Sequence, residues 1–273
     1  MGVMPELPEV ESVRRQLAPH LVGRTVVAVW TDHQARFDGV ERCVGSRIED
    51  LARRGKYLIA GLGGGHAPRQ LIMHLGMTGS FRVRGRDGWV PDPYVRATLT
   101  LDDGVVDFRD VRRFGRLSVV EGGDHRRIAT LAGLGPEPLS DAFTVDAFAA
   151  ALARTRMPVK PFLLTQRPVA GVGNIYADEV LWRARIDPRS RRVGPARAAR
   201  LHRTIREVIA EAIEREGTTF RDYQMVNGES GRNAAFLVAY GQEGRPCPRC
   251  GQPMVKIVLG GRGTTYCSAC QRI

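Results

Sequence analysis

The spacing of apolar positions along the chain changes near residue 25. Before that point apolar residues recur at helical spacing from Val10 to Leu21, which predicts a helix that begins near Pro8 and closes at Gly23. Beyond it, short runs rich in β-forming residues predict strands at 25–30, 57–60, 70–74, 80–83 and 95–101. Asp103-Gly104 predicts a hairpin turn into a strand at 105–108. This pattern indicates an antiparallel sandwich or barrel with one helix at its edge.

The pattern changes again between 126 and 140, where glycine and proline indicate a linker. After the linker the chain is predicted to be helical. Helices are expected from Thr144 to Arg154, from Pro161 to Gln166, from Asn174 to about Arg185, and along an amphipathic stripe at 201–213 that ends by Gly217. The segment 217–244 is polar and rich in glycine, as in a loop.

Four of the five cysteines form two closely spaced pairs, Cys247/Cys250 and Cys267/Cys270, separated by sixteen residues. This spacing predicts a four-cysteine zinc site, for which four unrelated thiols are the alternative. A closed thiolate site is structural, so we expect one zinc ion that holds the hairpin at 254–265 in place. Cys43, outside the pairs, is predicted to be a packing residue.

The 273 residues carry a net charge of +12, with a sequence pI of about 10.2. This balance favours a nucleic acid or an anionic membrane surface as partner. No apolar run approaches the roughly 18 residues needed to span a bilayer, and no signal peptide is recognisable, so we expect a soluble cytoplasmic protein.

The stretch Met4-Pro5-Glu6-Leu7-Pro8 offers unusual chemistry near the start of the chain. With Met4 removed, Pro5 has a free secondary amine that can form an iminium with a sugar aldehyde carbon, and Glu6 places a carboxyl beside it for proton transfer. The alternative is a helix entrance, since Pro8 suits the first helical position. Residues 1–3 precede Met4, and while they are attached the Pro5 nitrogen lies in an amide and is not nucleophilic. We therefore expect translation to start at Met4.

This stretch resembles the mature start of the formamidopyrimidine-DNA glycosylase family (Fpg, or MutM) of bacterial base-excision repair enzymes. The resemblance extends from Met4 to Arg272, and its motifs follow the family order. It implies a multidomain α+β fold: a β-sandwich domain at 4–125, a linker at 126–143, a helix-two-turn-helix domain at 144–240 and a zinc finger at 241–273. The two main domains are expected to flank a basic cleft with Pro5 at its floor. A monomer acting on duplex DNA with oxidised purines or abasic sites is implied, located in the bacterial cytoplasm with the nucleoid.

The same resemblance assigns catalytic roles to four residues. Pro5 attacks C1′ of the sugar and Glu6 assists ring opening. Lys56 follows Arg53-Arg54-Gly55, which on its own is a solvated strand edge; the family segment implies phosphate contact and help in β-elimination. Arg262, on the tight turn 260–263, is expected to contact phosphate and assist the second elimination.

The segments 74–79 and 110–115 carry the implied lesion contacts. Met77 and Phe114 are expected to fill the gap left by an everted base, and Arg112 to face the orphaned cytosine. Without the resemblance, Met77 and Phe114 are ordinary core residues. Val111 replaces a usual proline, and Tyr94 replaces a frequent phosphate-contacting histidine.

Gly171-Val172-Gly173-Asn174 opens a helix, where free amides favour an anion. By resemblance Asn174 contacts the backbone near the lesion, and Arg156 occupies the place of a phosphate-binding residue. The segment 218–236 corresponds to a loop that closes over the everted base.

Three alternatives remain open. An endonuclease VIII-like glycosylase would remove oxidised pyrimidines with the same amine chemistry. A non-catalytic damaged-DNA-binding protein would keep residues 1–3. A zinc-ribbon protein for single-stranded nucleic acid would need interleaved stacking positions, which the 7% aromatic content does not provide.

Overall fold

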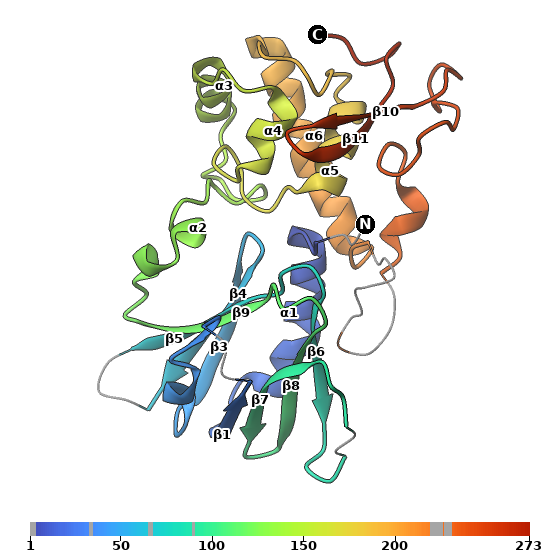
Figure 1. The fold of residues 1–273 in the computed structure, drawn as a ribbon. Helices are drawn as coiled ribbons and strands as arrows, with labels where there is room; N and C mark the ends of the chain where they lie inside the picture. The colour runs from blue at the N-terminus through green and yellow to red at the C-terminus, as the bar shows by residue number, and fades with distance from the viewer. Residues whose placement is uncertain (1–3, 33–34, 65–67, 89–90, 219–225, 227–230) are drawn as a thin grey trace. The chain divides into compact units, whose positions relative to one another are not determined.

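The computed structural model describes residues 4–32, 35–64, 68–88, 91–218, 226 and 231–273 (Figure 1). The chain divides into two compact units. Unit 1 is built on Glu9–Ala132, with the short segments that end at Pro5 and Gly231, and unit 2 on Gly133–Arg215 and Arg232–Ile273 with Glu6–Pro8.

Unit 1 contains two β-sheets (Figure 1). The four-stranded sheet has the order β1-β7-β8-β6 and is antiparallel throughout. The five-stranded sheet has the order β2-β9-β5-β4-β3 and is antiparallel except for the parallel pair β2 and β9. The strands are β1 (Val26–Thr31), β2 (Phe37–Asp38), β3 (Arg47–Arg54), β4 (Tyr57–Gly63), β5 (Arg69–His74), β6 (Gly79–Arg84), β7 (Val95–Leu101), β8 (Gly104–Asp110) and β9 (Arg116–Glu121).

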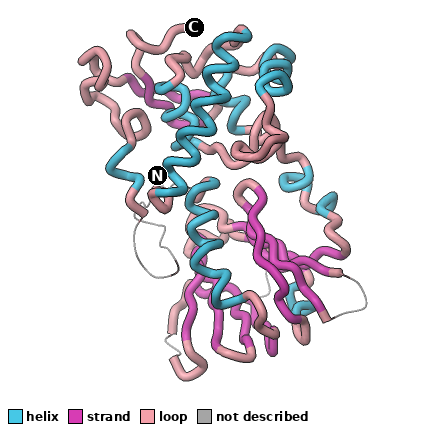
Figure 2. Tube along the Cα trace, turned by 180° about the vertical axis from the view of Figure 1, so that it is seen from behind, coloured by secondary structure: helices cyan, strands magenta, loops and turns pink. Residues whose placement is uncertain are grey.

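Both sheets contribute to one hydrophobic core with the helix α1 (Leu7–Leu21). Val10, Val13, Leu17 and Leu21 of α1 are fully buried in it, and seen from behind the helix lies between the two sheets (Figure 2). Cys43, in the short 3-10 helix η1 (Val40–Cys43), belongs to the same core. Its complete burial in this core confirms the packing role, and the same burial raises the pKa of its thiol to about 12. The predicted sandwich with one helix is confirmed, but the helix packs into the core against both sheets, and one strand pair, β2 with β9, is parallel rather than antiparallel.

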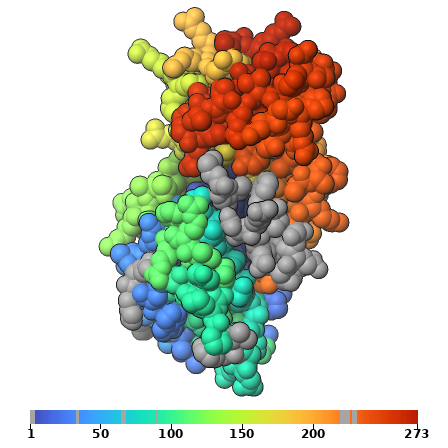
Figure 3. Space-filling model, turned by 45° about the vertical axis from the view of Figure 1, so that its right-hand side comes forward, coloured from blue at the N-terminus to red at the C-terminus, as the bar shows by residue number. Residues whose placement is uncertain are grey.

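Unit 2 is mainly helical. The longest helix, α6, carries the predicted amphipathic stripe, and α5 packs between α6 and the C-terminal hairpin. Its helices are α3 (Val145–Arg154), α4 (Val159–Leu164), α5 (Asn174–Arg183), α6 (Pro195–Glu214) and the 3-10 helix η3 (Asn233–Phe236). The hairpin consists of β10 (Val255–Leu259) and β11 (Arg262–Tyr266), joined by Gly260 and Gly261, which both have positive φ. In Figure 3 the C-terminal residues, in red and orange, form one continuous part of the surface of this unit.

The helical elements differ from the sequence prediction in two places. Helix α4 begins at Val159, so Pro161 occupies its third position rather than its first. The first-turn amides of a helix have no intrahelical partner, and a proline there removes no bond. The linker segment also contains helical turns, η2 (His125–Arg127) and α2 (Ala129–Ala132). Among the helices of the described residues, none combines the length and apolar character that a membrane crossing requires.

Candidate functional site

The carboxylate of Glu6 binds the amino-terminal end of α5. Glu6 is 1% exposed, and its oxygens accept N–H groups from Gly173 (2.6 Å), Ile175 (2.8 Å) and Tyr176 (3.3 Å). These amides have no partner within the helix, and the helix dipole favours a negative charge at this end. The sequence predicted an anion at this helix start, and within unit 2 that anion is a side chain of the protein itself. Glu6 is thus fixed in position next to Pro5 in the chain.

The turn that precedes α5 is shaped around the same stretch. Leu7 donates its N–H to the carbonyl of Gly171 (3.1 Å), and Gly171 has φ +83 with the Leu7 side chain against its Cα, so no larger residue fits. Gln166 closes the turn from within: its amide nitrogen donates to the Val172 carbonyl (2.5 Å), and its oxygen accepts the Gly171 N–H (2.7 Å). The turn between α4 and α5 is therefore rigid.

Asn174 is the first residue of α5 and is half-buried. Its side chain hydrogen-bonds with Tyr240, whose pKa is raised mainly by burial. The Oδ1 atom of Asn174 is buried and has no hydrogen-bond partner within the described part of the chain. Such an atom is costly unless a ligand or water satisfies it, which makes this helix start a candidate contact point.

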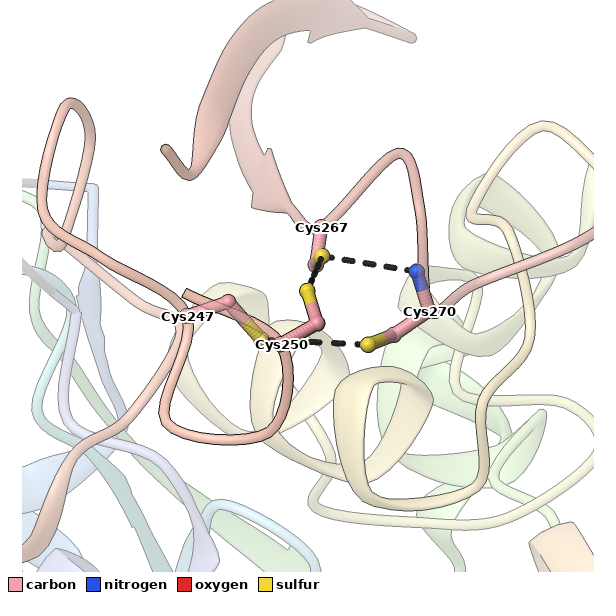
Figure 4. Close-up of side chains that lie close together, drawn as sticks. All are labelled: Cys247, Cys250, Cys267 and Cys270. Atoms are coloured by element: carbon pink, nitrogen blue, oxygen red, sulfur yellow. Dashed lines mark hydrogen bonds between the residues drawn. The ribbon is translucent and has the colours of Figure 1, made fainter. Parts of the chain in front are cut away.

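The four paired cysteines converge at one point of unit 2 (Figure 4). Their sulfur atoms all lie within 4.8 Å of one another; Cys247 and Cys270 are 3.9 Å apart, and Cys250 and Cys267 are 3.5 Å apart. Sulfurs bound tetrahedrally to zinc at about 2.3 Å would be separated by roughly 3.8 Å, so the cluster fits a zinc ion. The pKa of the Cys247 thiol is lowered to about 6 against the effect of burial, partly by the main-chain N–H groups of Arg249 and Cys250, whereas burial and the neighbouring thiols raise the pKa values of Cys267 and Cys270. The support for a metal is therefore the convergence of the four sulfurs.

A buried ion pair fixes the hairpin that follows the first cysteine pair. Lys160 Nζ lies 2.7 Å from Asp178 Oδ1, and both side chains are essentially inaccessible to solvent. The same ammonium donates to the carbonyl of Gly263 (3.0 Å), while Asp178 Oδ2 accepts the N–H of Thr265 (2.9 Å). Burial lowers the pKa of Lys160 and raises that of Asp178, because each charge loses water; the pairing and the backbone hydrogen bonds offset that loss. The pair thus holds β11 immediately after Arg262, whose own side chain is exposed.

In unit 1, a single buried carboxylate joins the two loops that carry Met77, Arg112 and Phe114. Asp110, at the end of β8, accepts the hydroxyl of Thr78 (2.5 Å) and the N–H of Gly115 (2.6 Å). The Thr78 hydroxyl oxygen in turn accepts the N–H of Arg112 (2.9 Å). The loop between β5 and β6 and the loop between β8 and β9 are therefore held side by side.

The two loops also touch through their backbones. Gly76 has φ +63, and a Cβ built there would lie 2.5 Å from the Gly115 nitrogen and the Phe114 carbonyl carbon. Met77 is half-buried and Phe114 is 42% exposed, with the guanidiniums of Arg112 and Arg36 at 5.1 and 5.9 Å from its ring centroid. A partly exposed aromatic ring on a fixed loop, flanked by cations, suits insertion into a base step. Neither Met77 nor Phe114 is a core residue.

Tyr94 lies in the turn that precedes β7. It is 40% exposed, its carbonyl accepts the N–H of Asp110 (2.9 Å), and the Arg109 guanidinium lies 4.8 Å from its ring centroid. Lys56 occupies the two-residue turn between β3 and β4 with Gly55, which has φ +56, and is half-buried.

Three comparisons with known proteins agree on the family. A model described as the formamidopyrimidine-DNA glycosylase N-terminal domain matches residues 4–117, one for the H2TH domain of the same enzymes matches 134–224, and one for a zinc finger found in FPG and IleRS matches 244–273. A formamidopyrimidine-DNA glycosylase from Deinococcus radiodurans is 46% identical, covering 98% of this chain and 97% of the relative. The chain belongs to the formamidopyrimidine-DNA glycosylase family. With the zinc-finger match, the four-cysteine cluster is identified as one structural zinc site.

Solved structures of this family extend the comparison to DNA. The MutM (Fpg) protein from Thermus thermophilus has a TM-score of 0.91 and 46% identity, and the match covers 98% of each chain. A Lactococcus lactis FPG mutant in complex with DNA containing Fapy-dG has a TM-score of 0.91 and 34% identity, covering 98% of this chain and 100% of that one. The wild-type L. lactis protein has also been solved with DNA containing an oxidised pyrimidine, at a TM-score of 0.89 and 34% identity over the same shares.

Several residues that organise the site were not predicted from the sequence. Lys160, Asp178, Asp110, Thr78 and Gln166 act through partners distant in sequence or through main-chain groups, and no local pattern marks them. Arg156, predicted to bind phosphate, is exposed, and its carbonyl accepts a hydrogen bond from Arg191 (2.7 Å). Most of the predicted base-covering loop, residues 219–225 and 227–230, lies outside the described residues, as do residues 1–3.

Proposed function

We propose that this chain is a bifunctional DNA glycosylase and AP lyase that removes oxidised purines, chiefly 8-oxoguanine and formamidopyrimidines, from duplex DNA. The observation that carries the proposal is the anchored Pro5-Glu6 stretch, with Glu6 fixed on α5, in a chain 46% identical to a formamidopyrimidine-DNA glycosylase. The L. lactis complexes with Fapy-dG and abasic-site DNA support it. We place the protein in the bacterial cytoplasm, where its DNA substrate lies.

Pro5 supplies the nucleophile once its nitrogen is a free secondary amine. The nitrogen attacks C1′ of the damaged nucleoside, the bond from C1′ to the base breaks, and the base leaves with a proton. Opening of the sugar ring then gives an iminium between C1′ and the Pro5 nitrogen. Glu6, one residue away in the chain, is the group assigned to proton transfer in ring opening.

The iminium acidifies the adjacent C2′ and drives two eliminations. Loss of a C2′ proton breaks the C3′–O bond, and a second elimination breaks the C5′–O bond, which leaves a one-nucleotide gap. Lys56 is assigned to phosphate contact and proton transfer in the first step, and Arg262 to phosphate contact in the second. Met77 and Phe114 fill the space of the everted base, Arg112 faces the orphaned cytosine, and Tyr94, Arg156 and Asn174 contact the backbone.

Parallel assays on two lesions test this assignment. We expect faster base release from an 8-oxoguanine:cytosine duplex than from a thymine glycol duplex, and strand cutting without added alkali on both the first duplex and an abasic duplex. A preference for thymine glycol would favour the endonuclease VIII-like alternative. This alternative is tested because an L. lactis relative has been solved in complex with DNA containing an oxidised pyrimidine. If the base is released but the strand is cut only after alkali is added, the protein is a glycosylase without lyase activity.

Pro5→Gly in a chain started at Met4 separates the amine chemistry from DNA binding. This variant keeps an N-terminal amine, but a primary one, and should give less borohydride-trapped adduct. Pro8→Ala is the matched control because Pro8 lies in the first turn of α1 and its nitrogen is never terminal. If a chain that keeps residues 1–3 binds lesion DNA without cutting it, the non-catalytic alternative describes that form.

A further inference from the structure

A group of basic side chains surrounds the C-terminal residues of unit 2. A cavity of about 550 Å³ is lined by Ala269, Cys270, Ile273 and five arginines: Arg185, Arg197, Arg200, Arg249 and Arg272. They come from the segment after α5, the first turns of α6, the first cysteine pair and the chain end. None of the five arginines takes part in the proposed repair chemistry.

Three of the guanidiniums are held by main-chain carbonyls. Arg197 donates to the carbonyl of Arg272 (2.6 Å) and Arg200 to that of Ala184 (2.8 Å). Arg249 donates to the carbonyls of Trp182 (2.6 Å) and Arg183 (3.0 Å), and its guanidinium lies 3.9 Å from the Trp182 ring centroid. Each guanidinium has five N–H donors, so donors remain for a ligand after these bonds are made. The charges are thereby fixed in place before any ligand arrives.

Within the described parts of the chain, none of the five guanidiniums forms an ion pair with a carboxylate. Burial and then the charge of Arg200 lower the pKa of Arg197; Asp187 opposes this shift but already binds Arg189 through two hydrogen bonds (3.0 and 2.6 Å). Burial and the charge of Arg185 likewise lower the pKa of Arg249, against the opposing charges of the Cys270 and Cys247 sulfurs. Like charges held together in this way repel, and a bound anion would relieve that repulsion.

The lining residues restrict the chemistry of the ligand. None of them is aromatic, so the cavity offers no surface for stacking a base. Guanidiniums match phosphate oxygens in bidentate geometry, and the volume exceeds what one phosphate needs. We propose that this cavity binds a run of linked phosphate groups. It is distinct from the Asn174 contact point, because Arg185 follows the far end of a ten-residue helix that is about 15 Å long.

Tripolyphosphate is the probe for this proposal, titrated calorimetrically into the zinc-loaded full chain. The variant Arg185→Ser/Arg272→Ser removes two exposed guanidiniums that form no hydrogen bond or ion pair with the described residues, and we expect at least a tenfold loss of affinity. The control Arg192→Ser/Arg203→Ser removes the same charge from exposed positions elsewhere in unit 2, and we expect less than a twofold loss. No saturable binding by the wild type, or equal losses in both variants, would overturn the proposal.

A second titration distinguishes the two sources of linked phosphates. If they belong to a nucleic-acid backbone, a short undamaged duplex should bind at two equivalents to the wild type and at one to Arg185→Ser/Arg272→Ser. If they belong to a free polyphosphate, the duplex should bind both proteins at one equivalent while the tripolyphosphate difference persists. Zinc content and melting temperature verify folding. Should the double variant fail this check, Arg185→Gln alone must lower tripolyphosphate affinity about threefold.

This experiment is independent of the repair assignment. Arg185 and Arg272 have no place in the proposed chemistry, so 8-oxoguanine excision by the double variant should match that of the wild type. Failure of excision in the wild type would refute the proposed function and leave the anion site standing. Normal excision by a wild type that does not bind tripolyphosphate would refute the anion site and leave the proposed function standing.

Discussion

Two short turns of the molecule carry an arginine that we propose contacts DNA, and they are held in different ways. In unit 1, the loop of Arg112 extends from a two-sheet sandwich and is fixed by the carboxylate of Asp110 and the close contact at Gly76. In unit 2, the turn of Arg262 belongs to a two-stranded hairpin that has too little core to fold alone, and it is fixed by the zinc site and the Lys160–Asp178 pair. A loop on a large core needs only local hydrogen bonds, whereas an isolated hairpin needs a metal and a buried charge pair.

Zinc removal should have the largest effect, because it should unfold the turn of Arg262 and leave the turn of Arg112 folded. Structural zinc contributes roughly 10 kcal/mol or more to folding in small zinc domains, so its loss should unfold the hairpin and release Arg262. We expect chelator-treated protein, verified metal-free, to bind an abasic duplex far more weakly and to recover when zinc is restored. Unit 1 of the metal-free protein should still show a thermal unfolding transition. Normal DNA binding by metal-free protein would contradict this view of the hairpin.

Lys160→Met should have the next largest effect, because it leaves the Asp178 carboxylate buried without its partner. Breaking a buried pair in this way costs about 3–5 kcal/mol, measured as urea unfolding of the zinc-loaded protein. Lys160→Met/Asp178→Leu should recover much of that loss. The control Arg203→Met breaks an exposed pair with Glu207 and should cost at most about 1 kcal/mol. Equal losses for Lys160→Met and Arg203→Met would show that the buried pair does not hold the hairpin.

Gly76→Ala tests the unit 1 turn. The new Cβ would overlap the backbone of the neighbouring loop at a positive φ, and we expect a destabilisation of about 3 kcal/mol with impaired lesion binding. Gly122→Ala is the matched control: its φ is also positive (+53), but nothing lies within 4 Å of its Cβ position, so only about 1 kcal/mol is expected. If both substitutions cost the same, the loop contact at Gly76 contributes nothing.

The smallest effect concerns pH. Burial, then the charges of Lys56 and Arg116, lower the pKa of His74 to about 4, and its Nδ1 accepts the N–H of Gly76 (3.1 Å). The unfolded chain takes up this proton near pH 6.5, well before the folded protein does, so stability falls as the pH drops from 6.5 towards 4. His74→Gln should remove about 1 kcal/mol of the loss between pH 7.5 and 5.5, as measured by unfolding at both pH values. An identical pH dependence in both proteins would exclude this contribution.

The sequence predicted those features that are encoded by residues close together in the chain. The zinc site followed from two cysteine pairs, the core face of α1 from its apolar period, and the turn of the C-terminal hairpin from glycine. The turn predicted at Asp103-Gly104 lies one residue earlier, at 102–103, because Gly104 is already the first residue of β8. Glu6 was predicted to sit beside the nucleophile, but its binding to the start of α5 joins residues far apart in the chain. The same holds for Asp110 with Thr78 and for Lys160 with Gly263. No local sequence pattern marks these pairs, because only the fold brings their members together. The assignments of Pro5, Lys56 and the DNA-contacting residues remain predictions.

The nucleophile is the central assignment and can be identified directly. Borohydride trapping on an 8-oxoguanine:cytosine duplex, followed by peptide mapping of the adduct, should place the crosslink on the amine of an N-terminal Pro5. A crosslink on a lysine, or normal cutting by protein whose intact mass shows residues 1–3 still attached, would contradict this account.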